Sequence, residues 1–169
     1  MAVVDALLER PYADAEQLGI YGSSYGGYMV AWTIGQTDRL KAAVSRAPVF
    51  DLESFYGTSD IGYSWSDSQF GGPPHENAAW YAAHSPSTFA HRATTPTLIL
   101  HGEADERCPI GQGEQMFVAL RRAGCETEFV RYPGGSHLFF RAGGRPEHRV
   151  DFLTRVLGWF SDHLGGPVG

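Results

Sequence analysis

Apolar residues recur along the chain in two forms, at helical spacing and in short uninterrupted runs. Val3, Val4, Leu7 and Leu8 recur at helical spacing and predict an opening helix. The uncharged run 18–22 predicts a buried strand, and residues 25–35 predict a helix. The apolar run 42–47 predicts a second strand, which Pro48 ends. Together these segments form a predicted strand-helix-strand unit.

The stretch 50–89 lacks both patterns, because glycine, proline, serine and aromatic residues are mixed in it without a period. Long irregular segments in compact domains are often functional loops or lids. We therefore predict an irregular functional segment. Its scattered aromatic residues are Phe55, Tyr56, Tyr63, Trp65, Phe70, Trp80 and Tyr81.

Regular patterns return after Pro96. The runs 97–101 and 126–132 predict two further strands, and 116–123 predicts a helix between them that Gly124 caps. A closing helix is predicted from apolar residues on one face, followed by a Gly165-Gly166 stop. That face consists of Val150, Leu153, Leu157, Phe160 and Leu164. Alternating strands and helices predict an α/β fold, in which a mostly parallel sheet is flanked by helices.

The composition is that of one globular domain over residues 1–169, with 43% hydrophobic residues. A net charge of -6 without any Lys/Arg cluster argues against a nucleic-acid partner. No apolar run is long enough to span a membrane, and the first residues do not resemble a signal peptide. We therefore expect a cytoplasmic protein without a membrane partner, in which Cys108 and Cys125 are buried or idle thiols.

A G-x-S-x-G motif, Gly22-Ser23-Ser24-Tyr25-Gly26, joins the first predicted strand to the following helix. A sharp strand-to-helix turn of this kind exposes a nucleophilic serine, and the flanking glycines leave room for the turn. Ser24 is therefore the candidate nucleophile. The amide of Tyr25 begins the helix, where it is placed to bind the oxyanion of a tetrahedral intermediate.

A serine nucleophile needs a histidine base and an acid that orients the histidine. The strand 97–101 leads into a loop with three candidate acids, Glu103, Asp105 and Glu106, and spacing alone does not separate them. The strand 126–132 leads into a glycine-rich loop with His137. These loops follow successive strands, at the sheet edge where α/β proteins place their sites, in the chain order of an α/β-hydrolase fold.

The other six histidines suit the role less well. His75, His84 and His91 precede the acid, while His148 and His163 belong to the closing helix. The remaining one, His101, directly follows an apolar strand and is predicted to be packed or hydrogen-bonded near the site. No HExxH motif or other ligand spacing is present, so neither a metal nor a cofactor is expected.

Several segments resemble the prolyl oligopeptidase family, especially its acylaminoacyl-peptidase and dipeptidyl-peptidase branches. The resemblance lies in the motif around Ser24, in 95–102, in 105–109 and in the histidine loop 134–137, and it extends over nearly the whole chain. It implies that Asp105 is the acid and that Arg107 holds a substrate carbonyl. The aromatic residues Phe55, Tyr56, Tyr63 and Trp65 are expected to line an apolar substrate pocket.

Members of this family normally carry a propeller domain and further strands before the nucleophile, and we expect this chain to lack both. The upstream loop that usually supplies a second oxyanion donor is then absent too. The uncharged strand 18–22 becomes an exposed sheet edge, whereas Glu126, Glu128 and Arg131 protect the last strand. We therefore expect a homo-oligomer, or a partner chain, to cover the exposed edge.

These features predict a serine hydrolase that cleaves the amide bonds of peptides or the ester bonds of small molecules. A catalytically inert fragment or assembly module that needs a partner chain is the alternative. A hydrolase of another family, such as a lipase or a dienelactone hydrolase, is a third possibility.

Overall fold

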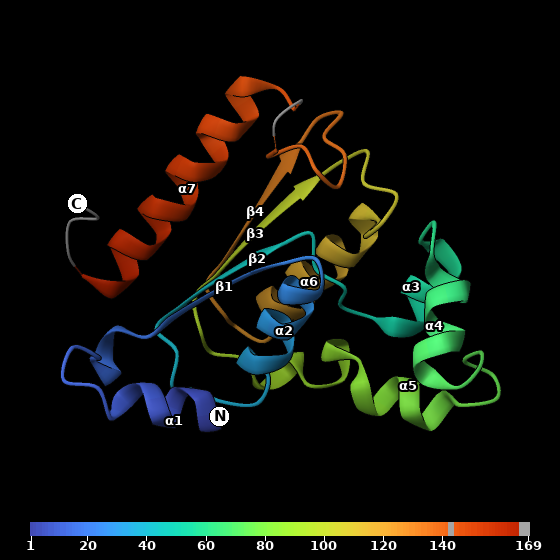
Figure 1. The fold of residues 1–169 in the computed structure, drawn as a ribbon, viewed down its shortest axis with the longest axis horizontal. Helices are drawn as coiled ribbons and strands as arrows, with labels where there is room; N and C mark the ends of the chain where they lie inside the picture. The colour runs from blue at the N-terminus through green and yellow to red at the C-terminus, as the bar shows by residue number, and fades with distance from the viewer. Residues whose placement is uncertain (142–143, 166–169) are drawn as a thin grey trace.

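Four strands form one parallel sheet in the part of the chain that the structure describes, which is residues 1–141 and 144–165 of a computed structural model (Figure 1). The strands are β1 (Gly19–Ser23), β2 (Ala42–Arg46), β3 (Thr97–Gly102) and β4 (Thr127–Tyr132), and they lie side by side in chain order. Because all pairs are parallel, the carboxyl ends of the strands meet at one edge of the sheet. All four predicted strands are confirmed to within one or two residues.

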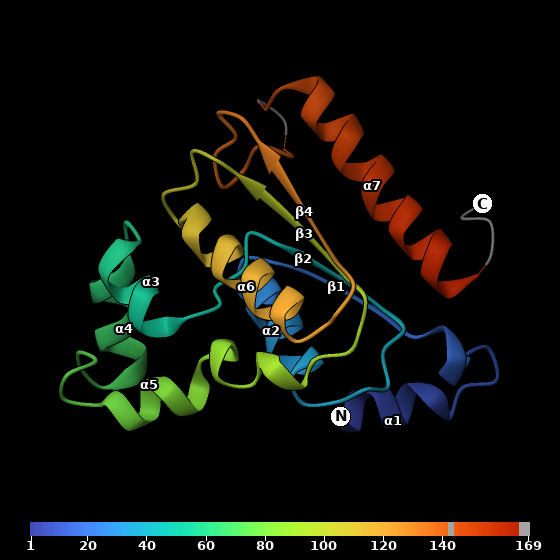
Figure 2. The same cartoon turned by 180° about the vertical axis from the view of Figure 1, so that it is seen from behind.

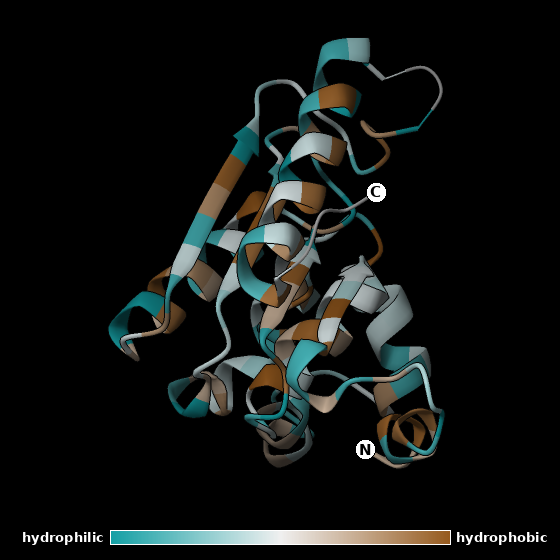
Figure 3. Cartoon of the chain, turned by 90° about the vertical axis from the view of Figure 1, so that its left-hand side faces the viewer, coloured by the Kyte–Doolittle hydropathy of each residue, from teal (hydrophilic) through white to brown (hydrophobic). Residues whose placement is uncertain are grey.

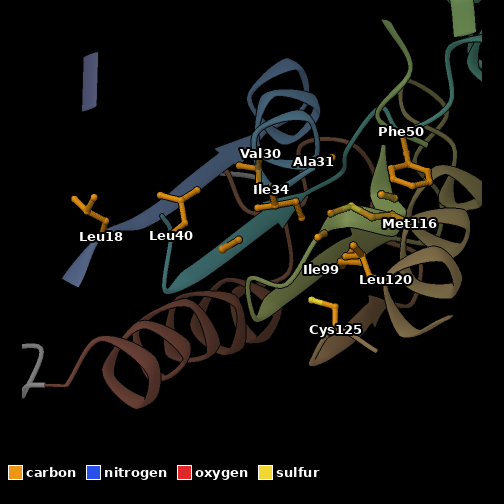
Figure 4. Close-up of a cluster of buried hydrophobic side chains, with 13 residues drawn as sticks. Leu18, Val30, Ala31, Ile34, Leu40, Phe50, Ile99, Met116, Leu120 and Cys125 are labelled. Atoms are coloured by element: carbon orange, nitrogen blue, oxygen red, sulfur yellow. The ribbon is translucent and has the colours of Figure 1, made fainter. Parts of the chain in front are cut away.

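Two helices cover one face of the sheet, α2 (Tyr25–Ile34) and α6 (Ile110–Arg122). In Figure 4, apolar side chains of both helices point toward the strands, and Met116 and Leu120 of α6 lie beside Ile99 of β3. The helix predicted over 116–123 begins at Ile110, six residues earlier than expected. Its first turns contain Gly111 and Gly113, which interrupt the apolar spacing that the prediction followed.

The opposite face is covered by α7 (Pro146–Leu164), as Figures 1 and 2 show from both sides. Its 19 residues make it the longest described helix, and no described helix is long and apolar enough to cross a membrane. Gly165 ends α7 with a positive φ of 66°, as a stop signal should, while Gly166 lies outside the described residues.

The predicted contact face of α7 is confirmed at Phe160, which packs against the sheet, but it is wrong at Val150, Leu153 and Leu157, which are exposed. Val150 and Leu153 are 66% and 57% exposed, whereas the buried Phe152 packs against the sheet together with three partly buried neighbours. These neighbours are Val156, Trp159 and Phe160. Hydrophobic residues recur around α7 (Figure 3), so it carries two adjacent apolar stripes, and the sheet contacts the more aromatic one.

The stretch predicted to be irregular, 50–89, contains three short helices, which is a correction. They are α3 (Leu52–Thr58), α4 (Gly62–Phe70) and α5 (Ala78–His84), and 3₁₀ turns follow at Pro86–Thr88 and Ala90–Arg92. Helices of seven to nine residues show too little of the helical period to be recognised, and tertiary packing stabilises them instead. Figure 1 shows them beside the main body, past the carboxyl end of β2.

The two edges of the described sheet differ in protection. On β4, Arg131 forms ion pairs with Glu103 and Glu114, and Glu128 pairs with Arg155 of α7. On β1, by contrast, the side chain of Tyr21 is 47% exposed. The opening helix α1 (Ala2–Leu8) and a 3₁₀ turn (Ala15–Gln17) lie near the amino end of β1 (Figure 2) and leave that edge open.

Candidate active site

Ser24 lies at the tight turn between β1 and α2, with backbone angles φ 60° and ψ -119°. Non-glycine residues rarely adopt this conformation, and it is the strained geometry of a nucleophile elbow. The Ser24 amide donates a 2.9 Å hydrogen bond to the carbonyl of Arg46 on β2, which anchors the turn.

The turn needs glycine at Gly22 and Gly27, because a Cβ atom there would collide with backbone. At Gly22 it would strike the carbonyl of Gly26, and at Gly27 it would lie 2.8 Å from the carbonyl oxygen of Arg46. A Cβ on Gly26 itself would meet nothing within 4 Å. Of the two motif glycines, only Gly22 is therefore needed to avoid a collision with the backbone. Gly27, the residue after the motif, is needed for the same reason.

Ser24, His137 and Asp105 lie in one hydrogen-bonded row. Nε2 of His137 is 3.0 Å from Oγ of Ser24, and Nδ1 of His137 is 2.7 Å from Oδ2 of Asp105. The other carboxylate oxygen of Asp105 accepts hydrogen bonds from the amides of Arg107 and Cys108. The Asp105 side chain is fully buried and both its oxygens have partners, so its orientation relative to the imidazole of His137 is fixed.

The structure distinguishes the three candidate acids. Glu103 pairs with Arg131 on the β4 side, and Glu106 is exposed. Only the carboxylate of Asp105 meets His137 among the described residues. The loops that carry these two residues follow β3 and β4, and the amide of Ala104 joins them through a 2.9 Å hydrogen bond to the carbonyl of Gly135.

Tyr25 is the first residue of α2, so its amide is one of those that a helix leaves without an intrahelical partner. The positive end of the helix dipole lies at the same place. Its side chain is 63% exposed and stacks on Tyr28, with 5.5 Å between the ring centroids. The amide of Tyr25 therefore lies beside Ser24 at the end of a helix that favours negative charge.

His101 packs against the loop that carries Asp105. This agrees with the prediction that it is packed or hydrogen-bonded near the site. It is completely buried, and its Nε2 lies 2.7 Å from the carbonyl oxygen of Cys108 and 3.6 Å from Oδ2 of Asp105. Burial lowers the pKa of this imidazole. His101 is therefore a neutral donor that fixes the turn between Asp105 and Cys108.

Cys108 is buried as predicted, but it is not remote from the site. Its Sγ is 4.0 Å from Oγ of Ser24. Burial and the nearby Asp105 carboxylate raise the pKa of this thiol to about 12, so it stays protonated. Among the described residues, no three His, Cys, Asp or Glu side chains are grouped so that they could hold a metal ion.

A cavity of about 420 Å³ opens beside Ser24 and is lined mostly by apolar and aromatic side chains. Of the four predicted pocket aromatics, Phe55 and Trp65 line it. Tyr56 packs edge-on against Tyr81 in the core below, and Tyr63 is 64% exposed at the surface. Successive side chains on an α-helix point about 100° apart. Because the four aromatic residues lie on α3 and α4, they cannot all face the same pocket.

The pocket also contains residues that the sequence analysis did not assign to it. These are Tyr28, Val49, Leu52, Ile61, Gln69, Phe70, Trp80, His84 and Cys108. Phe70 and Trp80 were noted as aromatic, but their role depended on the packing of three helices that were not predicted. Their rings stack, with centroids 4.4 Å apart, and form one wall of the cavity.

The comparison with known families agrees with this geometry. The model of the prolyl oligopeptidase family matches residues 1–167. The chain belongs to the prolyl oligopeptidase family. This confirms the resemblance seen in the sequence, and with it membership of a family of serine peptidases.

Relatives and solved structures of the family support the assignment. The uncharacterized peptidase YuxL of Bacillus subtilis is 44% identical over 163 residues, which cover 96% of this chain and 25% of that protein. Dipeptidyl-peptidase 5 of Porphyromonas gingivalis is 31% identical, over 97% of this chain and 24% of its own length. The chain therefore spans about a quarter of the length of these relatives.

The structure is similar to that of the acylaminoacyl peptidase of Pyrococcus horikoshii, with a TM-score of 0.90 and 32% identity. The match covers 98% of this chain and 27% of that one. A puromycin-hydrolyzing peptidase of Mycobacterium tuberculosis matches 99% of this chain and 25% of its own, with a TM-score of 0.85 and 30% identity. The predicted α/β-hydrolase fold is thus confirmed for this part of the family's structure.

Arg107, the residue that the family resemblance linked to a substrate carbonyl, lines the same pocket. Its guanidinium forms two hydrogen bonds to Asp60, of 2.7 and 3.1 Å, and these bonds raise the pKa of Arg107 and lower that of Asp60. Asp60 was missed in the sequence, because nothing in the chain marks a contact between residues 47 positions apart.

Proposed function

We propose that this member of the prolyl oligopeptidase family hydrolyses amide or ester bonds with Ser24 as the nucleophile. The observation that carries the proposal is the hydrogen-bonded row from Ser24 through His137 to Asp105. His137 accepts the hydroxyl proton at Nε2 as Ser24 attacks the carbonyl, and Asp105 holds Nδ1–H and stabilises the imidazolium. The same proton then passes to the leaving group, and water releases the acyl group in a second round.

The negative charge that develops on the carbonyl oxygen needs a donor. In the proposal, the amide of Tyr25 supplies it at the amino end of α2. Arg107 holds a second carbonyl of the substrate from the rim of the pocket, while Asp60 fixes the orientation of its guanidinium.

The substrate class follows from the cavity next to Ser24. Its aromatic walls, which include Phe55, Trp65 and Phe70, suit a large apolar side chain beside the bond that is cleaved. The relatives are named as peptidases, and peptides with an apolar residue at this position are the substrates that we propose. Short-acyl esters are chemically easier substrates of the same machinery.

The open edge at β1 bears on assembly. We propose that a further strand pairs with it, from a second copy of the chain or from a separate chain, because an uncharged strand with an exposed tyrosine is a poor sheet edge. Light scattering at micromolar concentration tests this idea, and a well-behaved monomer would count against it. If completion of the site depends on such pairing, the isolated chain is an inert module.

Covalent labelling tests the proposal directly. A fluorophosphonate should modify Ser24 in the purified protein, and the chain should hydrolyse a short-chain p-nitrophenyl ester. Both signals should vanish in Ser24→Ala and persist in Ser64→Ala, which removes an exposed hydroxyl bonded to the carbonyl of Ile61. A folded protein that is neither labelled nor active would favour the inert module instead.

A further inference from the structure

Arg46 is a buried arginine at the carboxyl end of β2, between the nucleophile turn and the histidine loop. Only 1% of it is exposed. Its Nε donates a 2.7 Å hydrogen bond to Oγ of Ser23, the residue before the nucleophile, and its Nη1 donates a 2.8 Å bond to the carbonyl of His137. One rigid guanidinium thus contacts the neighbour of the nucleophile and the backbone of the histidine itself.

A buried cation is unfavourable unless it has specific compensation. Arg46 has no ion pair among the described residues, since the carboxylate of Asp105 pairs with His101 and His137 instead. Burial lowers the pKa of the guanidinium. The compensation comes from the two hydrogen bonds, from the charge of the Asp105 carboxylate, which partly offsets the lowering of the pKa, and from the ring of Phe140, whose centroid lies 4.1 Å from Cζ. An apolar side chain would fill the same space with less desolvation, so packing alone does not explain a charge at this position.

The backbone of Arg46 takes part in the same junction. The Arg46 carbonyl accepts the hydrogen bond from the Ser24 amide. In the β1–β2 register, Arg46 lies opposite Ser23. Arg46 therefore holds the nucleophile turn with its main chain and the histidine loop with its side chain. Because β2 is buried along its whole length, this anchor is rigid.

The histidine loop has few other attachments on this side. Among the described hydrogen bonds, the Ala104–Gly135 bond and the bond between His137 and Asp105 fix the loop on the side of Asp105. Toward the nucleophile, the described bonds are the one between the Ser24 hydroxyl and Nε2 of His137 and the one from Arg46 to the His137 carbonyl. Arg46 is therefore the described side chain that ties the backbone of His137 to the turn of Ser24, while Asp105 and the buried Phe139 hold the loop from its other side.

We infer that Arg46 is a positioning residue of the hydrolytic site, which fixes the backbone of His137 relative to the turn that carries Ser24. It acts through those two residues and does not touch the substrate, since it lies under the loop and does not line the pocket. The inference rests on the proposed hydrolytic function, in which a displaced base transfers the proton poorly. Misplacement by about 1 Å is enough to lower a rate by about 100-fold.

Kinetics on substituted proteins test the inference. Arg46→Met, which keeps the length but loses both donors, should lower kcat for a p-nitrophenyl ester by about 100-fold and leave KM within about twofold. Arg46→Lys keeps the charge, but its single ammonium lacks the planar fork that reaches both acceptors, so about a tenfold loss should remain. Ser23→Ala removes one acceptor and should lower kcat by about threefold.

Arg92→Gln is the matched control, because Arg92 also lies over an aromatic ring, 5.1 Å from the centroid of Phe89, but contacts neither Ser24 nor His137. It should hydrolyse the ester at the rate of the unsubstituted protein. Circular dichroism and thermal melting identify variants that do not fold. If Arg46→Met fails to fold, Arg46→Lys and Ser23→Ala carry the test. Unchanged kcat in the folded variants of Arg46 would overturn the inference.

A spectroscopic readout separates the inference from the proposed function. The proton between Nδ1 of His137 and Asp105 should give a low-field ¹H resonance, which Asp105→Asn removes. Arg46→Lys should shift or broaden this resonance, whereas Arg92→Gln should leave it in place. An inactive protein that shows these changes would refute the hydrolytic function but support the positioning role, and a resonance unaffected by Arg46→Lys would overturn that role.

Discussion

The guanidinium of Arg107 meets the carboxylate of Asp60 through two hydrogen bonds, of 2.7 and 3.1 Å. Asp60 lies between α3 and α4, and Arg107 lies two residues after Asp105. Two further bonds join the same segments, from the amide of Asp60 to the carbonyl of Glu106 and from the hydroxyl of Ser59 to the carbonyl of Arg107. The wall of the pocket is thereby fastened to the acid loop.

Asp60→Asn should weaken substrate binding more than chemistry. Both side chains of the pair are nearly half exposed, so its loss should hardly change stability. Arg107 would lose its fixed orientation, and we expect KM for a peptide substrate to rise about threefold to tenfold while kcat stays similar. Steady-state kinetics measure this.

Glu103→Gln is the control for Asp60→Asn, since it breaks a comparably exposed ion pair with Arg131 away from the pocket. It should leave KM unchanged. The arginine also lowers the pKa of Asp60 from its ordinary value of 3.8. Any stability from the pair is therefore present above that pH and disappears as the pH falls below it. An equal rise of KM in both variants would argue against a specific role of Asp60.

The strained backbone at Ser24 should lower the stability of the folded protein, although the proposed activity needs a serine there. At φ 60° a side chain is strained, and glycine is not. Ser24→Gly should therefore be more stable than Ser24→Ala by about 1 kcal/mol, although both lack the proposed nucleophile. Chemical denaturation measures the difference.

Ser64 provides the opposite case, because it lies inside the regular helix α4. There, Ser64→Gly should be less stable than Ser64→Ala by about 1 kcal/mol. If glycine were the less stable replacement at both positions, strain at Ser24 would contribute nothing measurable to the stability of the fold.

Much of the sheet and of the hydrogen-bonded row could be predicted because both depend on local signals. A strand, a turn with glycine at Gly22 and a helix start define Ser24, and the order of strands places Asp105 and His137 at the same edge. The sequence order alone did not separate Asp105 from its neighbouring acids. The family resemblance did so, and the contact with His137 agrees with that choice.

Other parts of the site depend on contacts between distant segments, for which the sequence has no local signal. The helices α3 to α5 are too short to show their period, so Phe70 and Trp80 were not assigned to the pocket and Tyr63 was. Arg46 resembled an ordinary strand terminus. Its hydrogen bond to the carbonyl of His137 could not be predicted, because the two residues are 91 positions apart and only the fold brings them together.

Buried His101 predicts a loss of stability in mild acid. Because burial lowers its pKa in the folded protein, the unfolded chain binds its proton first as the pH falls below the ordinary value of 6.5. Stability should therefore decrease with falling pH, with a slope of up to about 1.4 kcal/mol per pH unit from this residue. The decrease continues until the pH reaches the lowered pKa of the folded state.

His101→Gln, which retains an N–H donor for the carbonyl of Cys108, tests the assignment. It should be less stable than the unsubstituted protein near pH 7, because a buried histidine is replaced by a differently shaped side chain. Its stability should change less between pH 6.5 and pH 5. Urea denaturation at several pH values gives the dependence of the unfolding free energy on pH for both proteins. Equal dependences would show that a group other than His101 causes the loss of stability in acid.

Trp65 should determine the preference for large apolar substrates. Its ring packs edge-on against Phe55 and Phe70, with centroids 5.8 and 5.1 Å apart, and it lines the cavity beside Ser24. Trp65→Ala should lower kcat/KM for an acetyl-phenylalanine ester by about tenfold, because the phenyl group loses apolar contact. The same change should alter kcat/KM for a p-nitrophenyl acetate by less than about threefold, since a methyl group does not reach the wall.

Tyr63→Ala is the matched control on the same helix, because Tyr63 points to solvent. It should change neither rate, and the ratio of the two kcat/KM values should stay that of the unsubstituted protein. A fall by the same factor for both esters in Trp65→Ala would mean that the substitution disturbs the row of Ser24 and His137 instead of the pocket. The ratio of the two esters, more than either rate, therefore measures whether the aromatic cavity selects the substrate.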